Sequence, residues 1–190
     1  FMDNVQGFLK LRQQEIQTQS DFLYDDIKFT TKIESPKMKN SAEFINTLYS
    51  IYLELPKPLR LERNFKESLN EPTTILNTLR LRDKNGPIIG FAKGGPLERY
   101  QLRSEIKDKN LGKNNTIFLE PIALKMGYWG LGGGHEMRQL FVMQAHAMNY
   151  EYLTSFALRD VIERRCKGME RAEFVTKFDP ERWDYYRIKL

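Results

Sequence analysis

The clearest candidate for chemistry in this chain is a run of glycines. Residues 128–134 read Tyr-Trp-Gly-Leu-Gly-Gly-Gly, a turn almost devoid of side chains. Glycine lets the backbone reach positive φ and lets a ligand approach without a Cβ in the way. A strand pattern precedes the run and a helix pattern follows it, and the first turn of a helix leaves N–H donors that attract an anion. The run therefore predicts a cradle for a phosphorylated ligand.

The spacing of this run disfavours the two commonest nucleotide-binding motifs. A P-loop ends in Gly-Lys-Ser or Gly-Lys-Thr, whereas this chain has Gly134-His135-Glu136. A dinucleotide-binding fingerprint that began at Gly130 would require a small residue at His135. The sequence also lacks the repeated alternation of strand and helix that a doubly wound sheet would show. A glycine-rich turn without any ligand stays as the alternative.

The other side chains that could carry chemistry stand alone. Glu120 is the only acidic residue on the strand before the glycines, so it is either a general base or a paired carboxylate of the fold. His135 and His146 are eleven residues apart on one predicted helix, and a separation of about 16 Å is too large for a shared metal ion. No ligand cluster surrounds Cys166 in the sequence. We therefore expect no metal site.

Apolar periodicity outlines the elements that would position these residues. Helical spacing predicts helices over residues 3–20, 41–55, 60–69, 135–148 and 160–167. Runs rich in β-formers predict strands over residues 26–33, 74–81, 87–93, 116–124, 150–158, 171–178 and 183–190. Ser41 suits an N-cap, and Asn85-Gly86 predicts a hairpin turn. Residues 97–102 either extend the strand before them past Gly94-Gly95 or form a separate edge.

Composition bounds the class of protein. A chain of 190 residues with 41% hydrophobic residues suits one globular domain, and no run approaches the ~18 apolar residues of a membrane helix. The net charge of +5 is spread over interleaved acidic and basic residues, so neither nucleic acid nor a membrane is an expected partner. A lone cysteine and the lack of a secretion signal predict a reducing, cytoplasmic setting. Because Phe1 precedes Met2, the sequence leaves open whether the chain is part of a longer protein, and it leaves homodimer formation open as well.

The residues around the glycine run resemble the central motif of the GNAT superfamily, the acyl-CoA-dependent N-acyltransferases. That motif is an apolar strand followed by Gln or Arg, two residues, Gly, one residue, then Gly or Ala. Gly132 and Gly134 match the two small positions, and Gly130 matches a glycine that commonly precedes them. Trp129 occupies the place of Gln or Arg, which is a departure from the pattern. The order of the predicted elements also follows the family from about residue 26 to residue 190.

The resemblance implies a fold and a cofactor. The fold would be α+β, a three-layer arrangement with a central, mostly antiparallel, twisted sheet flanked by helices. It would occupy residues 26–190, after an N-terminal helical extension at residues 1–25. The cofactor would be acetyl-CoA or another acyl-CoA. Its pantetheine arm would pair with the backbone of Ile122, Ala123 and Leu124, and its pyrophosphate would lie on the amides of Trp129, Gly130, Leu131, Gly132, Gly133 and Gly134.

The resemblance also implies an activity, the transfer of an acetyl or other acyl group to an amine of an unidentified small molecule or protein. Glu120 is the candidate base. The family's usual acid is a tyrosine, and its position falls at Arg164 in this chain. Tyr186 on the last strand is therefore the candidate acid, with Tyr185 and Cys166 as further substitutes.

The acceptor is not named by any motif. Residues 41–69, residues 97–115 and the last hairpin would form its pocket, and these are the parts of the chain with the least pattern. The alternative to an enzyme is a catalytically silent domain of this fold that senses CoA or serves as an interaction module. The unusual Trp129 and the missing tyrosine favour that alternative.

Overall fold

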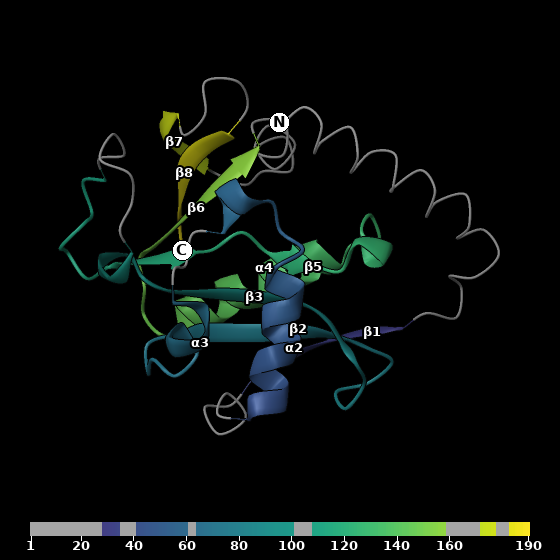
Figure 1. Ribbon diagram of the computed structural model, residues 1–190. Helices are drawn as coiled ribbons and strands as arrows, with labels where there is room; N and C mark the ends of the chain where they lie inside the picture. The colour runs from purple at the N-terminus through teal and green to yellow at the C-terminus, as the bar shows by residue number, and fades with distance from the viewer. Residues whose placement is uncertain (1–27, 35–40, 61–63, 101–107, 159–171, 178–182) are drawn as a thin grey trace. The chain divides into compact units, whose positions relative to one another are not determined.

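A computed structural model describes residues 28–34, 41–60, 64–100, 108–158, 172–177 and 183–190 (Figure 1). The helices predicted over residues 3–20 and 160–167 lie outside these ranges, as do Arg164 and Cys166. The contacts of the chain group it into two compact units. The first comprises the residues up to Pro72, Leu76–Ala92 and Ile122–Phe141, and the second comprises Thr73–Ile75, Lys93–Pro121 and Val142–Leu190.

The strands are hydrogen-bonded in the order β1-β2-β3-β4-β6-β8-β7, and β5 pairs with β3. β4 and β6 run parallel, whereas the other strand pairs with a described register are antiparallel. Strand β3 (Ile88–Pro96) contributes its first half to the first unit and its second half to the second. This mixed, mostly antiparallel sheet flanked by helices confirms the predicted α+β fold class.

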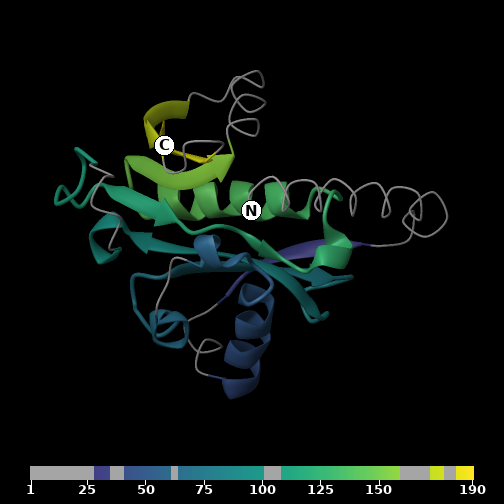
Figure 2. The ribbon, with the colours of Figure 1, turned by 45° about the horizontal axis from the view of Figure 1, so that its top comes forward.

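In the first unit, a helix lies on each face of the strands β1 (Phe29–Ile33), β2 (Ile75–Leu81) and the first half of β3 (Figure 2). One of these helices, α2 (Ala42–Tyr52), begins at Ser41, whose hydroxyl accepts a hydrogen bond of 3.4 Å from the Phe44 amide, as the sequence predicted. Its apolar side packs on the sheet in a buried cluster that includes Phe44, Leu48, Ile51, Leu76, Phe91 and Ala123.

The other helix of the first unit is the beginning of α4 (Gly133–Ala147). The side-chain amide of Asn77 on β2 donates a hydrogen bond of 3.1 Å to the backbone carbonyl of Met137. Asn77 follows Leu76 in the strand and so points to the face opposite α2. The strands of this unit therefore fix the start of α4, and β5 (Ala123–Leu124) is held on β3 just before it in the chain.

In the second unit, β4 (Thr116–Leu119) pairs with the end of β3 and with β6 (Tyr152–Leu158). β8 (Trp183–Lys189) lies between β6 and β7 (Ala172–Lys177), so both strands of the predicted closing hairpin are confirmed. The core of the unit is aromatic, with neighbouring ring centroids 4.6–6.5 Å apart among Tyr100, Phe118, Phe156 and Tyr185.

The single strand predicted over residues 116–124 is wrong in one respect, because the structure divides it into β4 and β5. Gly94 is paired with Leu119 and Phe91 with Ala123, so β3 advances three residues while its partner segment advances four. One extra residue therefore bulges out between β4 and β5, where Pro121 has no N–H to donate. Periodicity along one strand does not reveal such a bulge, since it depends on the pairing with the neighbouring strand.

Several other boundaries also differ in detail. β3 continues through Gly94-Gly95 but ends at Pro96, and Leu97–Arg99 form a 3-10 turn, so neither alternative for residues 97–102 is confirmed where the structure describes them. The helix predicted over residues 60–69 is shorter and becomes α3 (Phe65–Ser68). α4 begins at Gly133, two residues before the predicted start.

Candidate functional site

The glycine turn lies between β5 and α4 in the first unit. It opens with a 3-10 turn at Met126–Tyr128 and continues through Gly130 and Gly132, whose φ angles of 82° and 88° lie in the left-handed region. The bond from the Glu136 amide to the Gly132 carbonyl, 3.1 Å long, closes the first turn of α4. The amides between these two residues have no acceptor within the helix and are available to an anion.

The glycines of this turn differ in what surrounds them. A Cβ on Gly132 or on Gly134 would meet no atom within 4 Å. A Cβ on Gly133 would lie 2.4 Å from Cδ2 of Leu79 on β2, so Gly133 packs against the sheet where no side chain fits. Gly133 therefore fixes the start of α4, while Gly132 and Gly134 leave the first turn of the helix open to a ligand.

β5 offers a second set of backbone groups, directly before the turn. The Lys125 amide donates a hydrogen bond of 2.8 Å to the Ile89 carbonyl on β3, and Leu124 is paired with Gly90. Successive residues of a strand direct their backbone groups to opposite edges, so the N–H and C=O of Leu124 point away from β3. The indole Nε1 of Trp129 donates a hydrogen bond of 2.6 Å to that Leu124 carbonyl.

These residues fit the phosphate end of a CoA molecule. The turn supplies open amides at the N-terminus of a helix of 15 residues, where a negative charge is favoured. The carboxylate of Glu54 already accepts a hydrogen bond of 3.2 Å from the Met126 amide, so an anion would lie on the later amides of the turn. The edge of β5 that points away from β3 would fit the extended pantetheine arm, except where the indole of Trp129 covers that edge.

Glu120, the candidate base, follows β4 in the second unit and is 5% exposed. Its Oε2 lies 3.1 Å from Nζ of Lys93, which is buried on β3, and it accepts a hydrogen bond of 2.8 Å from the Tyr100 hydroxyl. Glu120 is thus a member of an ion pair inside the unit. A proton taken from a substrate would compete with both donors, and the role of Glu120 as a base stays a prediction.

Tyr100 is a residue that the interpretation of the sequence missed. Nη2 of Arg99 donates to its hydroxyl at 3.1 Å. Burial, followed by the charge of Glu120, raises the pKa of Tyr100 well above its ordinary value of 10.0, so the phenol keeps its proton near neutral pH. The signal available in the sequence was Lys93, a charged residue within an apolar run, which requires a partner when it is buried.

Tyr186, the candidate acid, is 1% exposed on β8 and is paired in register with Ser155 on β6. The next side chain along the strand, Tyr185, points to the other face, where its hydroxyl donates to Oδ2 of Asp108 at 2.6 Å. Arg187 forms an ion pair with the same carboxylate. Burial and the hydrogen bond to Asp108 raise the pKa of Tyr185. The role of Tyr186 as the acid stays a prediction.

Known proteins resemble this chain in structure and not in sequence. The sequence matches no family model and no curated protein. Among solved structures, an acetyltransferase of the GNAT family from Staphylococcus aureus Mu50 is 13% identical, with a TM-score of 0.54 over 86% of this chain and 99% of that chain. The chain has the GNAT fold.

Two further structures support this GNAT fold. The acetyltransferase of the GNAT family from Streptococcus pneumoniae is 13% identical, with a TM-score of 0.52 over 86% of this chain and 100% of that chain. NAA60 from Arabidopsis thaliana, solved in complex with acetyl-CoA, is 15% identical, with a TM-score of 0.53 over 86% of this chain and 98% of that chain. The resemblance predicted from the glycine motif is therefore confirmed at the level of the fold.

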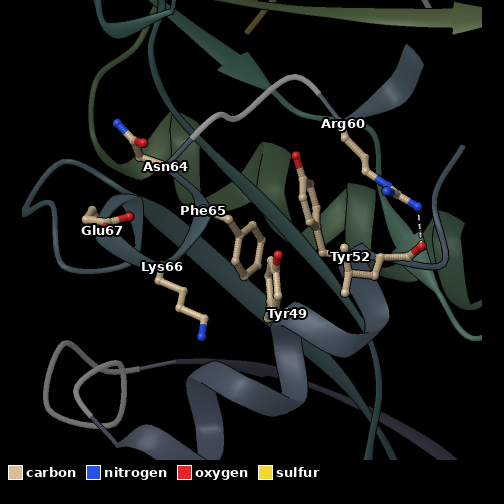
Figure 3. A pocket seen from close by; sticks show the side chains of 8 residues that line it. Tyr49, Tyr52, Arg60, Asn64, Phe65, Lys66 and Glu67 are labelled. Carbon is tan, nitrogen blue, oxygen red and sulfur yellow. Dashed lines mark hydrogen bonds between the residues drawn. The ribbon is translucent and has the colours of Figure 1, made fainter. Parts of the chain in front are cut away.

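The GNAT-fold chain also has a pocket on α2 and α3, within the first unit (Figure 3). One wall is a stack of rings, in which the centroid of Tyr52 lies 4.4 Å from that of Phe65 and 6.3 Å from that of Tyr49. Nζ of Lys66 lies 5.0 Å from the centre of the Tyr49 ring, so a cation already rests on this wall. The pocket has a volume of about 450 Å³ and is lined by Tyr49, Tyr52, Leu53, Arg60, Asn64, Phe65, Lys66 and Glu67.

The two histidines singled out in the sequence both lie on α4, and His135 is exposed at its first turn. Within the part of the chain that the structure describes, no group of three or more His, Cys, Asp or Glu residues could hold a metal ion. No helix in those same ranges is long and apolar enough to cross a bilayer.

Proposed function

We propose that this protein binds an acyl-CoA on the glycine turn and on β5, and that it transfers the acyl group to an amine. The observation that carries the proposal is the open first turn of α4, where Gly132 and Gly134 leave space for a ligand beside unpaired helix amides. Just before this turn in the chain, β5 has backbone groups directed away from β3, and an extended arm can pair with such an edge. A pyrophosphate followed by an amide-bearing arm describes CoA, whereas ATP has no such arm.

The transfer requires a deprotonated amine, a hydrogen-bond donor for the developing oxyanion and a proton for the leaving thiolate. Bound acyl-CoA would supply the thioester that the amine attacks. Glu120 is the proposed base, and it would have to exchange its contact with Lys93 or Tyr100 for the substrate proton. Tyr186 is the proposed acid.

The acceptor would bind in the pocket on α2 and α3. The end of α2 connects this pocket to the glycine turn, because Leu53 lines the pocket while the next residue, Glu54, accepts a hydrogen bond from Met126. The ring stack would hold a cationic or planar part of the acceptor, in the way that Tyr49 holds the Lys66 ammonium. An amine-bearing acceptor of this kind agrees with the proposed transfer.

A second candidate function is that of a domain that binds CoA but catalyses no acyl transfer. The buried ion pair of Glu120 with Lys93 favours this second function. A carboxylate that is held by an ammonium and a phenol can have a purely structural role. The same glycine turn would serve both functions, so binding alone does not separate them.

Calorimetry on the full chain tests the binding step. We expect acetyl-CoA and CoA to bind with similar affinity, because the cradle and β5 contact the part that they share. ATP should bind more weakly, since it has no pantetheine arm that could pair with β5. No affinity for CoA at concentrations up to millimolar, or tighter binding of ATP than of CoA, would contradict the proposal.

Turnover separates the enzyme from the silent domain. Acetyl-CoA is incubated with a panel of aromatic and aliphatic primary amines, and the free CoA thiol is measured with a thiol-reactive dye. Release of thiol that depends on one of the amines supports the transferase. Binding of acetyl-CoA without amine-dependent release supports the silent domain.

Replacing Tyr49 by alanine tests the acceptor pocket. The loss of one ring of the stack should raise the KM for an accepted amine by about 2- to 10-fold, which corresponds to the worth of an aromatic contact. The Kd for CoA should stay unchanged because Tyr49 contributes nothing to the glycine turn. Met143→Ala, at a position that is 66% exposed on α4, is the matched control and should change neither constant. An unchanged KM in Tyr49→Ala would show that the acceptor does not bind in this pocket.

A further inference from the structure

Trp129 occupies the backbone edge that the proposed cofactor would use. In the described part of the chain β5 pairs only with β3, so no strand is paired with its other edge. The Leu124 carbonyl points to that open edge and accepts the 2.6 Å hydrogen bond from the Trp129 indole. The indole is half-buried there. Where a strand edge exposes its backbone groups, a side chain that bonds to them prevents another strand-like segment from pairing.

The indole comes from the same turn that would hold the phosphates. Trp129 has an extended backbone, with φ −69° and ψ 148°, and it lies between the 3-10 turn and the left-handed Gly130. The side chain therefore reaches back to β5, while the open positions at Gly132 and Gly134 lie further along the turn. The indole thus bonds to β5, whereas the two open glycines lie three and five residues after it in the turn.

We propose that Trp129 is a latch on β5, whose indole must leave the Leu124 carbonyl before the pantetheine arm of an acyl-CoA can pair with the strand. The latch rests on the proposed function, because it assumes that the cradle binds CoA. It sets the affinity for the arm and not for the phosphates. A ligand that has the adenosine phosphates but no arm binds without moving the indole. The sequence pattern of the GNAT family has Gln or Arg at this position, so the latch is a property of this chain.

The affinity test compares two ligands on two proteins. Calorimetry gives the Kd of CoA and of adenosine 3′,5′-bisphosphate, which lacks the arm and the second phosphate of the pyrophosphate, for the wild type and for Trp129→Phe. Phenylalanine keeps an aromatic ring but has no N–H to donate to Leu124. We expect Trp129→Phe to bind CoA about 2- to 10-fold more tightly, the range that corresponds to one neutral hydrogen bond. Its Kd for the bisphosphate should equal that of the wild type.

A spectroscopic test reports on the indole directly and needs no activity. The chain contains two tryptophans, so protein labelled with 5-fluorotryptophan gives two fluorine resonances, and Trp129→Phe assigns them. We expect CoA to shift the Trp129 resonance and the bisphosphate to leave it in place. Trp129→Leu, which also lacks the donor, is the second variant if the phenylalanine variant proves unfolded by circular dichroism.

The outcomes separate the latch from the proposed function. Weaker binding of CoA by Trp129→Phe, or an equal change for both ligands, would overturn the latch while the CoA site stands. A Trp129 resonance that does not respond to CoA binding would overturn it as well. If neither ligand binds the wild type, the proposed function fails and the latch fails with it.

Discussion

Gly134→Glu is expected to abolish CoA binding, with a loss of at least 100-fold in affinity, and to leave the protein folded. A Cβ at Gly134 would meet no atom within 4 Å, so the new side chain extends into the space where the pyrophosphate would lie. Its carboxylate would repel the phosphates at close range. The same charge in the first turn of a helix is favourable to the helix, and glutamate has a higher helix propensity than glycine. The free energy of unfolding in urea should therefore stay the same or rise slightly.

Three variants show whether charge, bulk or folding is responsible. Gly134→Ala should bind CoA within a few-fold of the wild type, and Gly134→Lys should bind at least as well as the alanine variant. Gly133→Ala should lower the free energy of unfolding by about 1–3 kcal/mol, because its Cβ would lie 2.4 Å from Leu79. Gly132 is a poorer test position, since its φ of 88° strains any side chain. Full CoA affinity in Gly134→Glu would show that the turn does not hold the phosphates.

Lys93→Met is expected to lower the free energy of unfolding by about 3–5 kcal/mol. The substitution leaves the carboxylate of Glu120, which is 5% exposed, without the ammonium that lies 3.1 Å from it. Breaking a buried ion pair on one side is costly because the remaining charge loses its paired opposite charge. Chemical denaturation in urea, with the m-value as a check on two-state behaviour, measures the change.

The double variant Lys93→Met/Glu120→Gln is the control for this pair. It removes both charges and keeps an oxygen that can accept from Tyr100, so we expect it to recover at least half of the lost stability. A double-mutant cycle then gives the coupling between the two residues. A loss below about 1 kcal/mol in Lys93→Met would show that the pair contributes little. If Glu120 is also the base, Glu120→Gln should lower the amine-dependent turnover measured per molecule of folded protein.

Local signals in the sequence predicted most of the elements. Ser41 caps α2 as expected, because capping depends on a hydroxyl and an amide only three residues apart. The strands on either side of Asn85-Gly86 and the closing hairpin were predicted in the same way, from turn residues and β-rich runs. The bulge before β5 was missed because it arises from a mismatch between two strands that are distant in the sequence.

The sequence by itself determined the location of the glycine turn between a strand and a helix, and the resemblance of that turn to the GNAT motif predicted the fold. Glycine spacing and apolar periodicity are properties of neighbouring residues, so a single chain displays them. Only the tertiary structure decided which glycines are open and which one packs on Leu79. It alone paired Glu120 with Lys93 and Tyr100, and it alone directed the Trp129 indole to Leu124. Those contacts depend on which strand lies next to which, and burial then decides whether a polar side chain must find a partner.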